Sequence, residues 1–139
     1  MKSVLAKKTA KKVWHILDAS TMSLGRLSTE AARYLMGKHQ VDYTPNVDSG
    51  DFVIVLNAKQ VVLTGAKLTD KRYYSHSGIP GGFRDYSAQE VLDKSPRKII
   101  EHSVAGMLPK NKLQDVRLRR LKVYDGAEHP HAAQLANKE

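Results

Sequence analysis

The run Phe52-Val53-Ile54-Val55-Leu56 is the longest unbroken apolar stretch of the chain. Five consecutive apolar residues are typical of a strand buried on both faces, as in a parallel sheet with helices on each side. Shorter apolar segments at residues 13–17 and 61–64 predict two further strands of this kind. These segments therefore favour a small, mainly parallel sheet.

On either side of this run, apolar residues at helical spacing predict the helices. Residues 23–37 form one candidate, which Gly37 ends. Ser87 and Glu90 have the spacing of a capping box, and Ser95-Pro96 is typical of a helix start before residues 96–107. We expect another helix near residues 113–121 and short strands at 71–75 and 122–124. Alternating strands and helices in the first half predict βαβ units and the α/β class.

The chain has 139 residues, with 23 Lys plus Arg against 14 Asp plus Glu, so its net charge is +9. This length favours one domain over residues 1–139: a basic arm at 1–12, an α/β core at 13–124 and an irregular tail at 125–139. The absence of cysteine excludes disulfides, thiolate metal sites and cysteine nucleophiles. The positive charge indicates a polyanionic partner, nucleic acid before an anionic membrane surface.

The apolar runs are far shorter than the roughly 20 residues that span a bilayer, and the start of the chain lacks the apolar stretch of a secretory signal. We therefore expect an intracellular protein.

Residues 110–122 carry the densest positive charge, with six bases against one acid, Asp115. Arginines on a helix can grip phosphates with two parallel hydrogen bonds. The alternative is a solvated helix face, but the lysine-rich arm and the basic whole favour a nucleic-acid contact.

The segment Gly78 to Arg84 is a glycine-rich loop that follows Tyr73, Tyr74 and His76. Its glycines allow close approach of the backbone to a phosphate, and the rings before it can stack on unpaired bases. An ordinary surface loop is the alternative. No phosphate-binding P-loop or dinucleotide motif occurs in the chain.

Asp42, Asp48 and Asp51 lie within ten residues, beside a predicted strand. Carboxylates at a strand edge can hold Mg²⁺, which would suit a nuclease. We favour a loop that uses aspartates for turns and caps. His129-x-His131 has the spacing of a metal pair but no further ligands nearby, and no catalytic triad stands out.

Short motifs in a fixed order span residues 14–134. They are Trp14 to Asp18, Leu24-Gly25-Arg26-Leu27, Gly37-Lys38-His39, Tyr43 to Asp51, Val55 to Ala58, Thr64-Gly65-x-Lys67, Tyr73-Tyr74-x-His76-x-Gly78, Gly106 to Lys110, Leu121 to Tyr124, and His129-Pro130-His131-x-Ala133-Gln134. In order and spacing the chain resembles the bacterial form of large-subunit ribosomal protein thirteen. One departure is Gln114-Asp115, where many members of that family have a glycine and then a basic residue.

The resemblance implies a non-enzymatic constituent of the large ribosomal subunit in the cytoplasm, without cofactor, metal or small-molecule substrate. Its partners would be ribosomal RNA and neighbouring ribosomal proteins, and it would act early in subunit assembly. It also implies a three-layer α/β/α fold around a small, mainly parallel mixed sheet, with basic extensions at both ends. Residues 43–51 would then be a fixed surface loop that leads into a core strand.

We expect lysines and arginines to displace counterions from RNA phosphates, while unpaired bases meet His76 and the nearby tyrosines. The predicted RNA-binding residues are Lys7, Lys8, Arg26, Lys38, His39, Lys67, His76, Arg84, Lys110, Lys112, Arg117, Arg119, Arg120 and Lys122. Two alternatives stay open at this point: a Mg²⁺-dependent nuclease and a free-standing nucleic-acid-binding protein.

Overall fold

A three-stranded parallel sheet in the order β1-β2-β5 forms the centre of the computed structural model, which describes residues 11–136. Strand β1 spans Trp14–Asp18, β2 spans Phe52–Leu56 and β5 spans Leu121–Val123. Trp14 pairs with Phe52 and Val53 pairs with Leu121, so β2 lies in the middle. The apolar run 52–56 is thus confirmed as a buried strand, flanked on both sides.

Helices cover one face of this sheet: α1 (Leu24–Met36), α4 (Pro96–Met107) and α5 (Leu113–Arg119). Apolar side chains from α1 and α4 meet those of β2 in one hydrophobic core. The largest of its fully buried members are Leu27, Leu35, Val53, Val55, Ile99, Ile100 and Val104. Among the helices of residues 11–136, none has the length and apolar character that crossing a membrane requires.

The helix boundaries follow the local signals in the sequence. Gly37 ends α1 with a φ of 82°, a left-handed conformation that glycine adopts without strain, and its N–H donates to the carbonyl of Arg33. Ser87 caps α3 (Ala88–Lys94), and Glu90 completes the predicted capping box with a reciprocal hydrogen bond. These predicted boundaries are confirmed.

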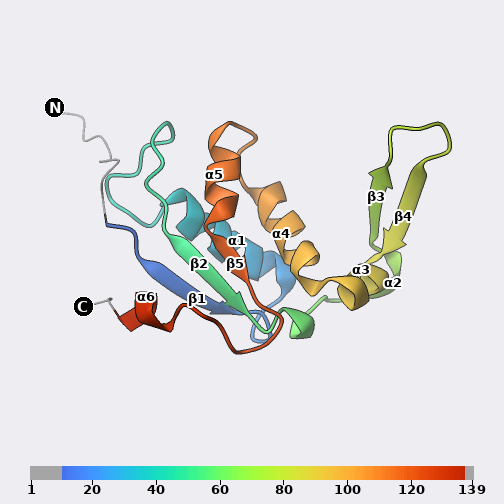
Figure 1. The fold of residues 1–139 in the computed structure, drawn as a ribbon, viewed down its shortest axis with the longest axis horizontal. Coiled ribbons are helices and arrows are strands. Elements are labelled where there is room, and N and C mark those ends of the chain that lie inside the picture. Colours follow the sequence, from blue (N-terminus) through green and yellow to red (C-terminus); the bar gives the residue numbers. More distant parts are fainter. Residues whose placement is uncertain (1–10, 137–139) are drawn as a thin grey trace.

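The C-terminal segment lies against the opposite face of the sheet. Strand alternation places Trp14, Phe52 and Ile54 on that face. The rings of Trp14 and Phe52 stack at 4.2 Å between centroids, and His131 packs against Trp14 at 4.9 Å. The α/β class is confirmed, and on this face the layer consists of the segment that includes α6 (Ala132–Ala136) (Figure 1). The sequence predicted an irregular tail at 125–139, whereas its residues 132–136 form the short helix α6.

A separate antiparallel hairpin, β3 (Arg72–His76) and β4 (Phe83–Ser87), stands apart from the sheet beyond α4 (Figure 1). Its base follows α2 (Lys67–Asp70) and precedes α3. The sequence did not predict β4, because its five residues are half-buried or exposed and show no apolar alternation. The strand expected at 61–64 is reduced to a single bridge between Ser23 and Val62, which follows the short helix η1 (Ala58–Gln60).

Candidate nucleic-acid interface

The N-terminal ends of the three parallel strands bring together charged residues that lie far apart in the sequence. His15 is the second residue of β1, Asp51 directly precedes β2, and Arg120 directly precedes β5. Because parallel strands begin at the same edge of a sheet, these residues share that edge. The aspartates of the loop 40–51 therefore meet cations contributed by other elements.

Asp48 is surrounded by three cationic side chains. Arg120 donates from Nη2 to Oδ1 at 2.6 Å and from Nη1 to Oδ2, and its Nη2 also donates to the Leu35 carbonyl at 3.1 Å. Lys12 Nζ lies 3.4 Å from Oδ2, and Arg117 Nε lies 3.8 Å from Oδ1. Burial acts to raise the pKa of Asp48, but the hydrogen bonds and charge of Arg120, with those of Lys12, outweigh it and hold the pKa below its ordinary value.

Arg117 and Arg120, two of the predicted RNA-binding residues, are buried in this arrangement. Their exposed fractions are 1% and 5%. The Arg120 guanidinium is hydrogen-bonded to Asp48, whereas Arg117 lies near it without a hydrogen bond from Nε or Nη2. The loop that carries Asp48 packs onto the junction of α5 and β5, so these arginines are internal counter-ions.

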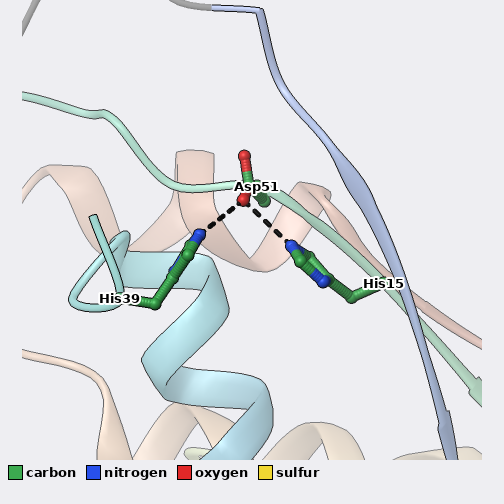
Figure 2. Close-up of side chains that lie close together, drawn as sticks. All are labelled: His15, His39 and Asp51. Atoms are coloured by element: carbon green, nitrogen blue, oxygen red, sulfur yellow. Dashed lines mark hydrogen bonds and ion pairs between the residues drawn. The ribbon is translucent and has the colours of Figure 1, made fainter. Parts of the chain in front are cut away.

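Asp51 forms a second buried cluster at the same edge (Figure 2). Its Oδ2 lies 3.0 Å from His15 Nε2 and 2.8 Å from His39 Nε2, while Oδ1 accepts the Val13 N–H at 3.0 Å. The ring of His15 stacks on Tyr34 of α1 at 4.0 Å. The Asp51 side chain is 1% exposed, and three donors satisfy it.

Gly50 sets the position of Asp51. A Cβ atom at residue 50 would lie 1.7 Å from the carbonyl oxygen of Leu35, so only glycine fits against the end of α1. The next N–H, that of Asp51, donates to the Tyr34 carbonyl at 3.0 Å. The loop is therefore fixed to α1 just before β2 begins.

The nitrogens of His15 and His39 and a carboxylate oxygen of Asp51 lie within 4.8 Å of one another, a spacing that a divalent cation could bridge. A histidine that binds metal through Nε2 carries its proton on Nδ1, which then needs an acceptor. The Nδ1 of His39 is buried and has no partner among residues 11–136. This favours a His39 ring that donates from Nε2 to Asp51, and so a structural role for the cluster.

The three aspartates of the loop do not form a common cation site within the described part of the chain. Asp48 and Asp51 have separate internal partners, and Asp42 is half-buried in the loop. The sequence did not predict that His15 and His39 contact Asp51, because they lie 36 and 12 residues from it. The available signal was a histidine inside the apolar segment 13–17.

The pair His129 and His131 also has an internal role. The Tyr124 hydroxyl lies 2.7 Å from His131 Nε2, and the His131 N–H donates to His129 Nδ1 at 3.2 Å. These contacts fasten the C-terminal segment beside Trp14, the residue that His131 packs against.

Most of the remaining predicted RNA-binding residues are exposed, on several elements. The exposed members are Arg26, Lys38, Lys67, His76, Arg84, Lys110, Lys112 and Arg119. Lys122 is half-buried on β5, and the Nε2 of His39 is taken by Asp51. Lys7 and Lys8, with most of the predicted arm, lie outside the described residues.

Among these exposed bases there are two local groups, each formed by residues of a single turn or hairpin. The turn between α4 and α5 presents Lys110 and Lys112, with Lys110 Nζ donating to the Ala105 carbonyl at 3.3 Å. The hairpin presents His76 and Arg84, and the Gly78 N–H donates to His76 Nδ1 at 2.9 Å, which orients that ring. Both groups face outward, and Lys110, Lys112 and Arg84 are their positively charged members.

Comparison with known proteins gives a consistent result. Residues 12–130 match the family model described as ribosomal protein L13. The chain is 53% identical over 135 residues to a protein of Pseudomonas fluorescens named large ribosomal subunit protein uL13, covering 96% of this chain and 95% of that protein. Proteins of the same name from Ectopseudomonas mendocina and Azotobacter vinelandii are 52% and 53% identical with the same coverage.

Proposed function

The chain belongs to the ribosomal protein L13 family, and on that premise we propose that it binds ribosomal RNA through exposed basic side chains and supports early assembly of the large subunit. Members of this family are structural constituents of the large ribosomal subunit and not enzymes, and they act in the bacterial cytoplasm as part of the ribosome. The observation that carries the proposal is the match across residues 12–130, together with 53% identity over 96% of the chain.

The charge of the described surface supports RNA as the direct partner. Lys110, Lys112 and Arg119 are exposed around α5, while Arg120 is paired with Asp48 inside the fold and Arg117 lies beside the same carboxylate. Exposed cations release condensed counterions when they meet phosphates, and a rigid α/β core fixes the spacing of such contacts. Neighbouring ribosomal proteins would cover other parts of the surface.

Sedimentation of a cell lysate tests this function. We expect the protein to migrate with the large subunit in a sucrose gradient and to remain bound through a high-salt wash. Recovery of the protein at the top of the gradient, free of large subunits, would contradict the proposal.

A pair of double variants tests the role of the exposed bases. Replacing Lys110 and Lys112 with Ala should release the protein from isolated large subunits at lower salt than wild type, because two phosphate contacts are lost. The matched control replaces Arg33 and Lys59, two exposed bases outside the predicted set, and should behave as wild type. Equal release of both variants would remove Lys110 and Lys112 from the interface.

A further inference from the structure

A cleft of about 1020 Å³ lies between the hairpin β3–β4 and the helices α4 and α5. Tyr73 and Tyr86 are a directly opposed pair on the hairpin, and both line the cleft. The Tyr73 ring meets the ring of His102 on α4 edge-on, with 5.4 Å between centroids. Sites for small organic ligands commonly have volumes of about 300–1,000 Å³, so the cleft is large enough for a nucleotide.

The floor of the cleft combines apolar surface with an unpaired donor. Val91, Leu118 and Leu121 contribute the apolar part. The Tyr73 hydroxyl is buried and has no hydrogen-bond partner among residues 11–136. Burial also raises the pKa of Tyr73, so the hydroxyl keeps its proton and remains a donor. A buried O–H without an acceptor is unfavourable, and a ligand that supplies one relieves this.

The rim of the cleft is positively charged. Lys71, Arg72, Lys98 and Arg119 line it, against two acids, Glu101 and Asp115. Arg72 is paired with Asp85 at 3.6 Å, whereas Lys98 and Arg119 form no ion pair within the described part of the chain. Two cations beside an aromatic floor thus remain for an anionic ligand.

We propose that this cleft receives one unpaired nucleotide of the ribosomal RNA, with its base against Tyr73 and Tyr86 and its phosphate at Lys98 and Arg119. Aromatic side chains stack on unpaired bases of any type, and flanking cations track the backbone. The excess of bases on the rim disfavours a basic protein tail as the occupant. The proposal rests on the function proposed above and adds the form of RNA that is recognised.

Short-wavelength ultraviolet cross-linking of purified large subunits, followed by mass spectrometry of the peptides, tests the cleft. We expect nucleotide adducts on the peptides that contain Tyr73 or Tyr86. Subunits that contain the protein but give no adduct on these peptides would overturn the nucleotide proposal and leave the proposed function intact. Cleft peptides cross-linked to another protein would overturn it in the same way. Absence of the protein from large subunits would overturn both.

Two substitutions at Tyr73 separate stacking from folding. Tyr73→Leu removes the ring and should lower the adduct yield on the Tyr86 peptide about tenfold, as expected for loss of a base stack. Tyr73→Phe keeps the ring and its packing, and should retain most of the yield. Phe83→Leu is the matched control, because Phe83 is an exposed ring of the same hairpin outside the cleft lining. Equal yields from Tyr73→Leu and Phe83→Leu, with both incorporated in subunits, would refute the assignment.

Discussion

Replacing Arg120 with Met tests whether the arginines of α5 and its C-terminal junction stabilise the fold from inside. Met keeps most of the length of the side chain but removes the guanidinium that donates to both Asp48 oxygens and to the Leu35 carbonyl. The Arg120 side chain is 6% exposed and that of Asp48 is 19% exposed, so the carboxylate would lose its main partner in a largely buried place.

Breaking a buried ion pair by removing one partner costs about 3–5 kcal/mol. Asp48 would keep Lys12 at 3.4 Å and Arg117 at 3.8 Å, and part of it reaches solvent. We therefore expect Arg120→Met to lower the free energy of unfolding by about 3 kcal/mol, at the low end of that range. Urea denaturation of the purified full chain at neutral pH measures the change.

Arg119→Met is the matched control, because Arg119 is the preceding residue and is exposed. Substitutions on the surface away from specific contacts usually change stability by less than about 0.5 kcal/mol. A double-mutant cycle with Asp48→Asn then isolates the coupling between the two charges. Equal stabilities of Arg120→Met and Arg119→Met, or a coupling near zero, would refute the internal role of Arg120.

The Asp48 network also predicts a pH dependence with a definite sign. The folded-state pKa of Asp48 lies below its ordinary value of 3.8, so its contribution to stability is complete above that value and is lost as pH falls through the folded pKa. The difference in stability between wild type and Asp48→Asn should therefore shrink as the pH is lowered below about 4. A difference that stays constant from neutral pH to pH 2 would contradict this.

Three further substitutions address the rest of the framework, each measured by urea denaturation. Gly50→Ala places a methyl group 1.7 Å from the Leu35 carbonyl oxygen. It should destabilise the chain by more than about 2 kcal/mol, since the backbone must move on both sides of the contact. Wild-type stability would show that the backbones of residues 35 and 50 are less closely packed. Asp51→Asn replaces one carboxylate oxygen with an NH₂ donor, so either the two imidazoles or the Val13 N–H lose their acceptor, and we expect a loss of about 1–3 kcal/mol. Unchanged stability would show that the cluster contributes little to the fold. Ser87→Ala removes the cap of α3 and should cost about 1 kcal/mol, and an unchanged midpoint would refute the contribution of the capping box.

The core elements were predictable because their signals are local. The five consecutive apolar residues of the run 52–56 indicate by themselves that this strand is buried. Gly37, Ser87 and Pro96 lie directly at the helix boundaries that they mark. Strand β4 was not predictable in this way. Its side chains pair across the hairpin and lie largely in solvent, so burial imposes no periodicity on the sequence.

The candidate site was less predictable because its contacts span long distances along the chain. Asp48 and Arg120 are 72 residues apart, and Asp51 and His15 are 36 residues apart. The local sequence around each residue predicts only a common role: an aspartate in a loop, an arginine in a basic cluster, a histidine in a strand. Only the shared starting edge of the parallel strands brings them together, and this register is set by the whole sheet.

Helix α5 shows how such a long-range partner reverses a local rule. By apolar periodicity, Val116 should face the core and Arg117 should face solvent. The structure has the opposite arrangement, with Val116 42% exposed and Arg117 1% exposed. Arg117 and Arg120 are three residues apart and share one side of the helix end, where Asp48 supplies the counter-charge, while Arg119 lies off that side and remains exposed. Substituting all three arginines together would therefore combine unfolding with loss of RNA contact. Lys110, Lys112 and Arg119 are exposed, so the proposed RNA contact is better tested through these three residues.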